Sequence, residues 1–294
     1  MKQAILITAY KNAKQIYNII NYLGKDFEYY IHIDKKSLID LSEIKACENV
    51  HIFKEYVVNW GSVNHLKAIL LLVNKAIEDK QNVFFHLITG QDFPVKTKDY
   101  FLNELDITKD YLEYFELPAD CWAEDNGGIS RLEYYYPYEI INDKSFIGNI
   151  LIRVLLKTQK IFKIKRNVPY NIFPKLYGGS TYWSLTRDSL QYVLDFTNKN
   201  KKALECMKYT LCSEEIYFQS ILLNSQYATN IVNDNLRYID WTTERGGHPA
   251  FLDMTDYEKI KDSNKIFARK FHENYSEELY KRLLETKNAL HRQN

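Results

Sequence analysis

Short, mostly apolar runs alternate with segments of helical spacing along the first 90 residues. The apolar runs have the length of strands buried on both faces, and they cover residues 4–9, 28–34, 50–53 and 83–89. Between them, apolar residues recur every three or four positions over 12–23 and 62–78. This alternation predicts a mostly parallel, doubly wound α/β sheet flanked by helices. Such sheets bind ligands at the carboxyl ends of their strands, here the loops after Tyr10, Asp34, Phe53 and Gly90.

The second half of the chain has a different pattern. Residues 111–175 are rich in aromatic side chains and are mostly irregular. After Gly178 the pattern predicts a strand at 180–186, helices at 188–197 and 213–224, and a strand at 236–241. Because no repeat, low-complexity tract or Pro/Gly/Ser linker interrupts the chain, we expect one continuous domain.

The overall charge and the cysteines exclude several classes of protein. The chain has 39 Lys and Arg against 38 Asp and Glu, a net charge of +1, so nothing predicts a nucleic-acid partner. The four cysteines, Cys47, Cys121, Cys206 and Cys212, form no CxxC pair and have no His at zinc-ligand spacing. We expect free thiols, no metal site and, since no signal or anchor segment is visible, a cytoplasmic protein.

One segment has the pattern of a helix that lies on a membrane surface. From Phe146 to Arg166, apolar residues recur at helical spacing, and all six charged residues are positive. This pattern favours an anionic lipid surface and predicts peripheral contact with the inner face of the cell membrane. The favoured alternative is a helix whose apolar side packs on its own domain.

Several common catalytic motifs are absent from the sequence. It has no GxSxG, GxxxxGK[ST] or GxGxxG, which disfavours an α/β-hydrolase, a P-loop NTPase and an ordinary dehydrogenase. None of the 18 Asp residues forms an Asp-x-Asp pair, which holds a divalent ion on the donor diphosphate in many α/β sugar transferases. If this chain transfers a sugar, another group must neutralise the leaving diphosphate.

Seven motifs in the chain resemble those of a known family. They are YYIHIDKKS (29–37), WGSVNHLKAILLL (60–72), HLITGQDFPVKT (86–97), YGGSTYWSLTRD (177–188), SEEIYFQSILLNS (213–225), RYIDW (237–241) and FARKF (267–271). In this order they are similar to the core-2/I-branching enzymes, glycosyltransferase family 14, which include β-1,6-N-acetylglucosaminyltransferases, peptide O-xylosyltransferases and many bacterial members. The similarity runs from about residue 4 to residue 271 and is weakest over 117–175.

The resemblance implies a single GT-A-type domain over 1–271, with a nucleotide-binding half (1–110), an acceptor and catalytic half (111–271) and a C-terminal helix (272–294). It implies an inverting transfer from a UDP-sugar donor to a hydroxyl of a glycan or lipid-linked acceptor, without divalent metal or another cofactor. A bacterial enzyme of surface polysaccharide synthesis is the matching expectation. The alternative, from a different class, is a catalytically silent, lectin-like relative that binds sugars or nucleotides.

A cationic pair near the C-terminal end is the expected substitute for the metal. Lys270 matches the family's diphosphate-binding lysine, and Arg269 beside it can offer a planar fork to phosphate oxygens. Related chains often carry a second cation just after a His-Pro pair, where this chain has Ala250. Arg245, Arg269 or a main-chain N–H group is expected to take that role.

A single carboxylate suffices as general base for an inverting transfer, because UDP leaves as an anion. The motif SEEIYFQ puts Glu215 where the family has this base, and its neighbour Glu214 is the less favoured candidate. Ser213 is expected to cap the helix that begins there. Since a helix dipole stabilises anions in the first turn, we expect Glu215 to be ionised at neutral pH.

The nucleotide is expected near the first strands. Asp34 resembles the family's uridine-contacting aspartate, and His32 on the same strand face is either a second contact or a buried histidine. Main-chain groups of Ala9 and Tyr10 are placed to hold the uracil edge. Asp92 lies near the usual metal-clip position and either contacts the nucleotide or only orients its loop.

The acceptor and sugar site is predicted from scattered residues. Trp241 matches a family acceptor-site tryptophan, whereas for Trp60 a core position is favoured. Gly179, with Ser180 after it, suits a close approach of backbone to the donor, because no Cβ intrudes. Arg131 and Glu116, in the variable middle of the chain, are the remaining acceptor candidates.

Overall fold

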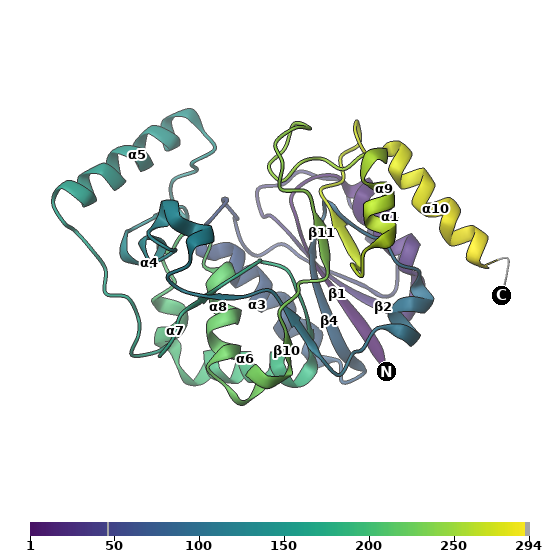
Figure 1. The fold of residues 1–294 in the computed structure, drawn as a ribbon, viewed down its shortest axis with the longest axis horizontal. Coiled ribbons are helices and arrows are strands. Elements are labelled where there is room, and N and C mark those ends of the chain that lie inside the picture. The colour runs from purple at the N-terminus through teal and green to yellow at the C-terminus, as the bar shows by residue number, and fades with distance from the viewer. Residues whose placement is uncertain (46, 292–294) are drawn as a thin grey trace.

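The computed structural model describes residues 1–45 and 47–291. A seven-stranded sheet with the order β10-β6-β9-β4-β1-β2-β3 forms its centre (Figure 1). The strands are β1 (Lys2–Ala9), β2 (Phe27–Ile33), β3 (Val50–Phe53), β4 (Asn82–Thr89), β6 (Asp110–Leu112), β9 (Trp183–Thr186) and β10 (Ile231–Val232). The predicted α/β fold with a central sheet flanked by helices is confirmed.

The pairing of the strands is mostly parallel, as predicted. Strand β1 pairs parallel with β2 and β4, and β2 pairs parallel with β3. Strand β9 departs from this pattern, because it runs antiparallel to both of its neighbours, β4 and β6. It also begins only at Trp183, so residues 180–182 of the predicted strand form a loop instead.

Helices cover both faces of the sheet. Alternate residues of β1 point to opposite sides, so Ala4 and Leu6 join one core and Ile5 and Ile7 the other. The first core packs against α3 (Val63–Glu78), α6 (Arg187–Lys199), α7 (Lys201–Glu205) and α8 (Glu214–Leu223). The second packs against α1 (Ala13–Leu23), α2 (Ser42–Lys45), α9 (Tyr257–Asp262) and α10 (Glu277–His291). This burial of both faces explains the apolar strand runs in the sequence.

Two small sheets complete the fold. One has the order β11-β12-β5 and consists of β11 (Arg237–Ile239), β12 (Phe267–Arg269) and β5 (Asp92–Pro94). The other pairs β7 (Phe115–Glu116) with β8 (Tyr177–Gly178). Buried Arg237 ties the first of them to the central sheet, because its guanidinium donates to the carbonyls of Leu87 (2.9 Å) and Trp183 (2.7 Å).

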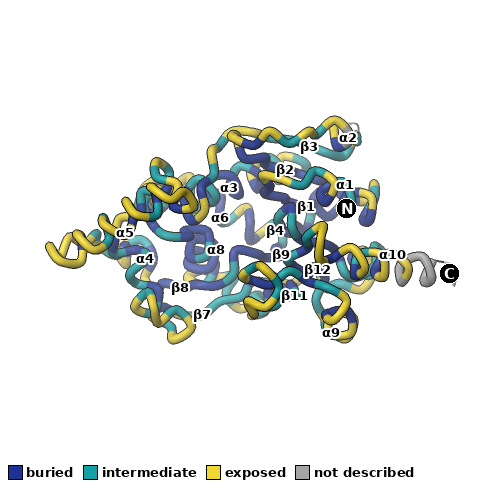
Figure 2. Tube along the Cα trace, turned by 90° about the horizontal axis from the view of Figure 1, so that it is seen from above, coloured by how far each residue is buried: buried dark blue, intermediate teal, exposed yellow. Residues whose placement is uncertain are grey.

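Helix α5 (Phe146–Ile161) projects from the body of the molecule, beyond the short helix α4 (Ser130–Glu133) (Figures 1 and 2). Only Gly148, Ile152 and Gln159 of this helix are buried. The favoured expectation that its apolar side packs on the domain is therefore wrong for most of its apolar residues. The cause is that α5 contacts the body along one narrow face.

The predicted elements of the two halves lie in the structure within a few residues of their expected bounds. The helix predicted at 62–78 is α3, and the strand predicted at 236–241 shortens to β11. The four cysteines are free, as expected. The division into a nucleotide half and an acceptor half stays a prediction, and residues 292–294 of the expected C-terminal helix lie outside the described part of the chain.

Replacing Arg237 by Met should weaken the junction between the two sheets. We expect the free energy of unfolding to fall by about 3 kcal/mol, because buried carbonyls lose their charged donor. Urea unfolding followed by circular dichroism measures the change. Arg153→Met is the matched control, since this exposed arginine on α5 should tolerate the same change within about 0.5 kcal/mol. Equal loss of stability in both variants would contradict the role given to Arg237.

Candidate active site

Helix α8 begins with two adjacent glutamates, and the loop before it is fastened to the segment that precedes α3. The N–H of Cys212 donates to the carbonyl of Gly61 at 3.0 Å. Gly61 has φ +73°, and a Cβ there would lie 2.9 Å from Leu211, so this close approach requires glycine. The expected cap is wrong: Ser213 has helical backbone angles, and its side chain makes no capping bond.

Glu215 forms an ion pair with Arg131 inside a half-buried cluster. Arg131 Nη1 donates to Glu215 Oε2 at 2.8 Å, and its Nε donates to Asp125 Oδ2 at 2.7 Å. The guanidinium lies 3.6 Å from the centre of the Trp122 ring, which holds its plane. Of the Glu215 side chain 27% is exposed, so one edge of the carboxylate faces solvent. The structure thus brings together Arg131 and Glu215, which are 84 residues apart.

The expectation that Glu215 is fully ionised at neutral pH is wrong. Burial, and secondly the charge of Glu214, raise its pKa to about 7, while Arg131 acts in the opposite direction. Removal from water and a second carboxylate outweigh the helix dipole, which stabilises a first-turn anion by only about 0.3–1 kcal/mol at exposed positions. The carboxyl group is therefore poised to exchange a proton near neutral pH.

Glu214 lies in a separate polar chain behind Glu215. It is buried, and its Oε1 is 2.9 Å from His65 Nδ1. His65 Nε2 is in turn 3.2 Å from Thr8 Oγ1, near the end of β1. Sequence patterns did not single out His65, although it stands in the WGSVNH run. His65 is thus the partner of Glu214, whereas the side chain of Glu215 is partly exposed to solvent.

Arg269 and Asp92 form a buried ion pair on β12 and β5. Arg269 Nε lies 3.0 Å from Asp92 Oδ1, and Asp92 Oδ2 accepts from Thr89 Oγ1 at 2.6 Å. Asp92 is completely buried, so the structure corrects its expected contact with the nucleotide: it orients the loop after β4. Arg269 contacts Asp92 through Nε, and the expected contact of its guanidinium with a diphosphate stays a prediction.

Tyr182 is a buried ring beside Arg269. Its ring lies 4.2 Å from the Arg269 guanidinium, and it is buried. Burial raises the pKa of Tyr182, and the charges of Asp92, Glu215 and Glu214 also raise it, against the effect of Arg269. The charges of Asp92 and Arg269 and those of the two glutamates thus act on the same ring. The motifs that contain them are distant in the sequence but lie near each other in the fold.

Lys270 is the half-buried cation at the same place. Burial and the neighbouring Arg269 lower its pKa to about 8, and Lys11 and Lys144 lower it further. Its Nζ donates to the carbonyl of His248 at 3.3 Å. Two lysines from distant parts of the chain therefore act on Lys270 in this region. Lys11 and Lys144 were not among the predicted site residues, since nothing in their local sequence marks them.

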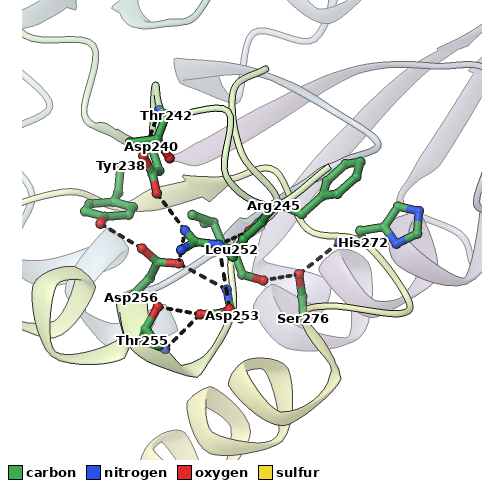
Figure 3. Close-up of polar contacts among 11 residues, drawn as sticks. Tyr238, Asp240, Thr242, Arg245, Leu252, Asp253, Thr255, Asp256, His272 and Ser276 are labelled. Atoms are coloured by element: carbon green, nitrogen blue, oxygen red, sulfur yellow. Dashed lines mark hydrogen bonds and ion pairs between the residues drawn. The ribbon is translucent and has the colours of Figure 1, made fainter. Parts of the chain in front are cut away.

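Arg245 does not stand free as a second diphosphate ligand. Figure 3 shows its guanidinium among carboxylates: Nη2 donates to Asp240 at 2.6 Å and to Asp256 at 2.8 Å. Its Nε donates to the carbonyl of Phe251 at 2.7 Å. These bonds hold residues 240–256 together and occupy the guanidinium. The expected role of Arg245 as a diphosphate ligand is therefore wrong.

The residues predicted to hold the nucleotide organise the loop after β3. Asp34 Oδ1 accepts from the N–H of Val58 at 3.2 Å, and buried His32 accepts through Nε2 from the N–H of Tyr56 at 3.1 Å. Burial lowers the pKa of His32 to about 4, so it is neutral, and the alternative of a buried structural histidine is the correct one. The carbonyls of Ala9 and Tyr10 accept from Asp34 N–H and Ser37 Oγ.

A hollow of about 430 Å³ carries the predicted acceptor tryptophan. Exposed Trp241 lines it together with Glu113, Asn235 and Lys265. Glu116 is absent from its lining; its exposed carboxylate pairs with Lys175 at 3.2 Å. The carboxylates in the lining are Glu113, three residues earlier, and Asp234, and sequence reasoning singled out neither.

Gly179 links this hollow to Glu215. Its N–H donates to the Glu215 carbonyl at 2.9 Å, and a Cβ at Gly179 would lie 1.9 Å from the carbonyl oxygen of Glu113. The backbone that approaches Gly179 closely in this structure is therefore that of Glu113. The carbonyl of Ser180 accepts from Gln219 Nε2 at 2.8 Å, which fixes this loop on α8.

Trp60 is half exposed rather than in the core, contrary to the favoured expectation. Lys144 Nζ lies 4.2 Å from the centre of its ring. Because Lys144 also influences Lys270, the indole stands at the edge of the lysine cluster. Residues 1–45 and 47–291 contain no group of three or more His, Cys, Asp or Glu side chains that could hold a metal ion, and metal independence stays a prediction.

Comparison with known proteins gives one family. The model of the Core-2/I-branching enzymes matches residues 5–266. Beta-glucuronosyltransferases GlcAT14B and GlcAT14A of Arabidopsis thaliana are 27% and 26% identical, over 83% of this chain and 56% and 54% of theirs. Xylosyltransferase 1 of Mus musculus is 24% identical over 79% of this chain and 23% of its own.

The chain spans about half the length of these glucuronosyltransferases. Among solved structures, the apo-form glycosyltransferase GlyE of Streptococcus pneumoniae aligns with a TM-score of 0.38 at 12% identity. That alignment covers 98% of this chain and 60% of the other.

The two charged neighbours of Glu215 should shift its pKa in opposite directions. We expect Glu214→Gln to lower the pKa of Glu215 from about 7, because a like charge is removed. Arg131→Gln should raise it, because the compensating cation is lost. Carboxyl chemical shifts in a glutamate-labelled sample, titrated by pH and assigned with Glu215→Gln, measure both changes. Shifts of the same sign in the two variants would contradict this account.

Proposed function

The chain belongs to the Core-2/I-branching enzyme family, and we propose that it transfers a sugar from a UDP-sugar to a hydroxyl group with inversion. The donor sugar is GlcNAc, xylose or another hexose, and the acceptor is a glycan or a lipid-linked saccharide of the kind used in bacterial surface polysaccharides. The observation that carries the proposal is the partly exposed Glu215 carboxylate, which Arg131 holds at 2.8 Å and whose pKa is raised to about 7 by burial and by Glu214.

Glu215 acts as the general base in this reaction. Its ionised form takes the proton of the acceptor hydroxyl while that oxygen attacks the anomeric carbon and the bond to the diphosphate oxygen breaks. The proton stays on Glu215, and UDP leaves with the bonding electron pair. Arg131 supports this role because it holds the carboxylate from one side at 2.8 Å and leaves the other edge for the acceptor.

The leaving diphosphate is neutralised by lysines in the proposed reaction. Lys270 is the principal cation, and Lys11 and Lys144 are the candidates for the second positive charge that Ala250 does not supply. Burial and Arg269 lower the pKa of Lys270 to about 8, and Lys11 and Lys144 add to this effect. This excess of positive charge around Lys270 supports an anion-binding site, since a diphosphate would relieve it. Arg245 is no longer a candidate, as its guanidinium is committed to Asp240 and Asp256.

The proposed transfer proceeds without a divalent metal. Asp92, the carboxylate nearest to the usual position of a metal clip, is buried against Arg269 at 3.0 Å. A carboxylate that is already neutralised by an arginine is a poor ligand for a divalent cation. Transfer measured after treatment with EDTA should therefore keep its full rate.

Glu215→Gln should lower kcat for sugar transfer by about 10²–10⁴-fold, because the amide cannot accept the hydroxyl proton. Binding of UDP, followed by calorimetry, should be almost unchanged. Glu116→Gln is the matched control, since that carboxylate is exposed and lies outside the Trp241 hollow. If no nucleotide sugar releases UDP with the wild-type protein and any acceptor, the lectin-like alternative takes the place of the enzyme.

Only the ionised form of Glu215 can act as the base, so the rate of sugar transfer should depend on pH. kcat/KM should rise with pH through about 7, because the general base must be deprotonated, and fall again above about 8, because Lys270 must keep its charge to bind the donor. In Glu214→Gln the rising limb should move to lower pH. A rate that is flat between pH values well below and above 7 would exclude Glu215 as the titrating base.

Lys270→Gln should weaken UDP binding and raise KM for the donor by about tenfold or more, since one charge-assisted contact is lost. Lys144→Gln should have a smaller effect of the same sign. Lys25→Gln, an exposed lysine before β2, serves as the control for the change in net charge. Thermal-shift titration with UDP and with UDP-GlcNAc, UDP-Glc, UDP-Gal and UDP-Xyl reports these affinities and identifies the donor.

A further inference from the structure

Helix α5 exposes a continuous apolar surface to solvent. Ile147, Val154 and Ile161 are 69%, 58% and 63% exposed, and Ile150 and Leu151 are about half exposed. At 100° per residue these five side chains fall within an arc of about 100° on one side of the helix. A contiguous exposed apolar surface of this kind marks an interaction site.

The opposite side of α5 is fastened to the body. Ile152 packs in a small core with Tyr134, Tyr136 and Tyr138. Gln159 accepts from the N–H of Tyr135 at 2.8 Å and donates to its carbonyl at 3.0 Å. The helix is therefore held in place with its apolar surface turned outward, as the exposed outer turns in Figure 2 show.

The charges of α5 are all positive and border this surface. Arg153, Lys157 and Lys160 fall within an arc of about 60° next to the apolar arc. In the described part of the chain none of these three forms an ion pair, and no acidic residue lies between Phe146 and Arg166. Apolar side chains flanked by unpaired cations match the boundary of an anionic lipid layer, where acyl chains lie beside negative headgroups.

We propose that α5 docks the protein on an anionic bilayer, with Ile147, Val154 and Ile161 in the acyl boundary and the basic residues among the headgroups. A second copy of the chain is a poorer occupant, because two α5 surfaces would bring like charges together. Within residues 1–45 and 47–291 no helix is long and apolar enough to cross a bilayer. The docked helix lies along the surface.

The position of α5 relates the membrane to the candidate active site. Helix α5 packs on a segment that includes Tyr138. The carbonyl of Tyr138 accepts from Asn59 Nδ2 at 2.7 Å, and Asn59 directly precedes Trp60 in the chain. Lys144, two residues before the helix, stands over Trp60 and influences Lys270. A bilayer in contact with α5 therefore lies on the side of the molecule where the lysine cluster is found. Docking itself does not depend on the proposed function.

Cosedimentation with vesicles tests the proposal. We expect the protein to bind phosphatidylcholine vesicles that contain phosphatidylglycerol, and to bind much less to pure phosphatidylcholine or at high salt. Arg153→Gln/Lys157→Gln/Lys160→Gln should weaken binding by about tenfold or more. Lys25→Gln/Lys80→Gln/Lys109→Gln is the matched control, as it also lowers the net charge from +1 to −2 at exposed positions. It should bind like the wild type.

A second variant tests the apolar surface. Ile147→Ser/Val154→Ser/Ile161→Ser should lose binding to anionic vesicles while urea unfolding stays unchanged, because these side chains are exposed. Equal vesicle binding by either α5 variant and the wild type would overturn the proposal. So would a dimer in size-exclusion chromatography that only the serine variant abolishes, since α5 would then be an interface between copies. UDP release from a soluble acceptor reports the transferase activity separately.

Discussion

The desolvation of two consecutive glutamates at the start of helix α8 is the constraint on which the site depends. Two adjacent carboxylates in a partly buried place cannot both ionise without compensation. In the structure each glutamate has its own partner. His65 lies against Glu214, and Arg131 lies against Glu215. The compensation is incomplete for Glu215, whose pKa is about 7. This incompleteness makes Glu215 a group that can exchange protons at neutral pH.

The scaffold around these glutamates is held by charged residues that do no chemistry themselves. Arg237 joins the three-stranded sheet to the central one, Arg269 pairs with Asp92 across β12 and β5, and Arg245 gathers the carboxylates of residues 240–256. In each case an arginine fork meets several fixed acceptors, the geometry that guanidinium suits and ammonium does not. Arg237 and Arg245 are therefore committed to the fold, whereas Lys270 remains the proposed ligand of the diphosphate.

Local patterns predicted most of the fold and only part of the site. Apolar runs such as 83–89 and the helical spacing of 62–78 placed β4 and α3 because both elements are buried along their length. The reversed direction of β9 was not predictable, since strand direction depends on distant partners. The resemblance to the family identified Glu215 and Lys270 as candidate site residues. Burial and an adjacent residue, Glu214 or Arg269, are the largest causes of their pKa shifts, and burial is not visible in the local sequence. The further charges, Arg131, Lys11 and Lys144, come from elements far away in the chain, and no local signal identifies such contacts.

Lys270 and Glu215 would respond differently to the diphosphate of the proposed reaction. Lys270, with a pKa of about 8, becomes more fully protonated when a diphosphate binds, because an adjacent anion favours its charged form. The same anion would raise the pKa of Glu215 and weaken it as a base if the two lay in direct contact. Glu215 has Arg131 as its ion-pair partner at 2.8 Å, whereas the cations that act on Lys270 are Arg269, Lys11 and Lys144. The carboxylate and the lysine are therefore tuned by separate sets of charges.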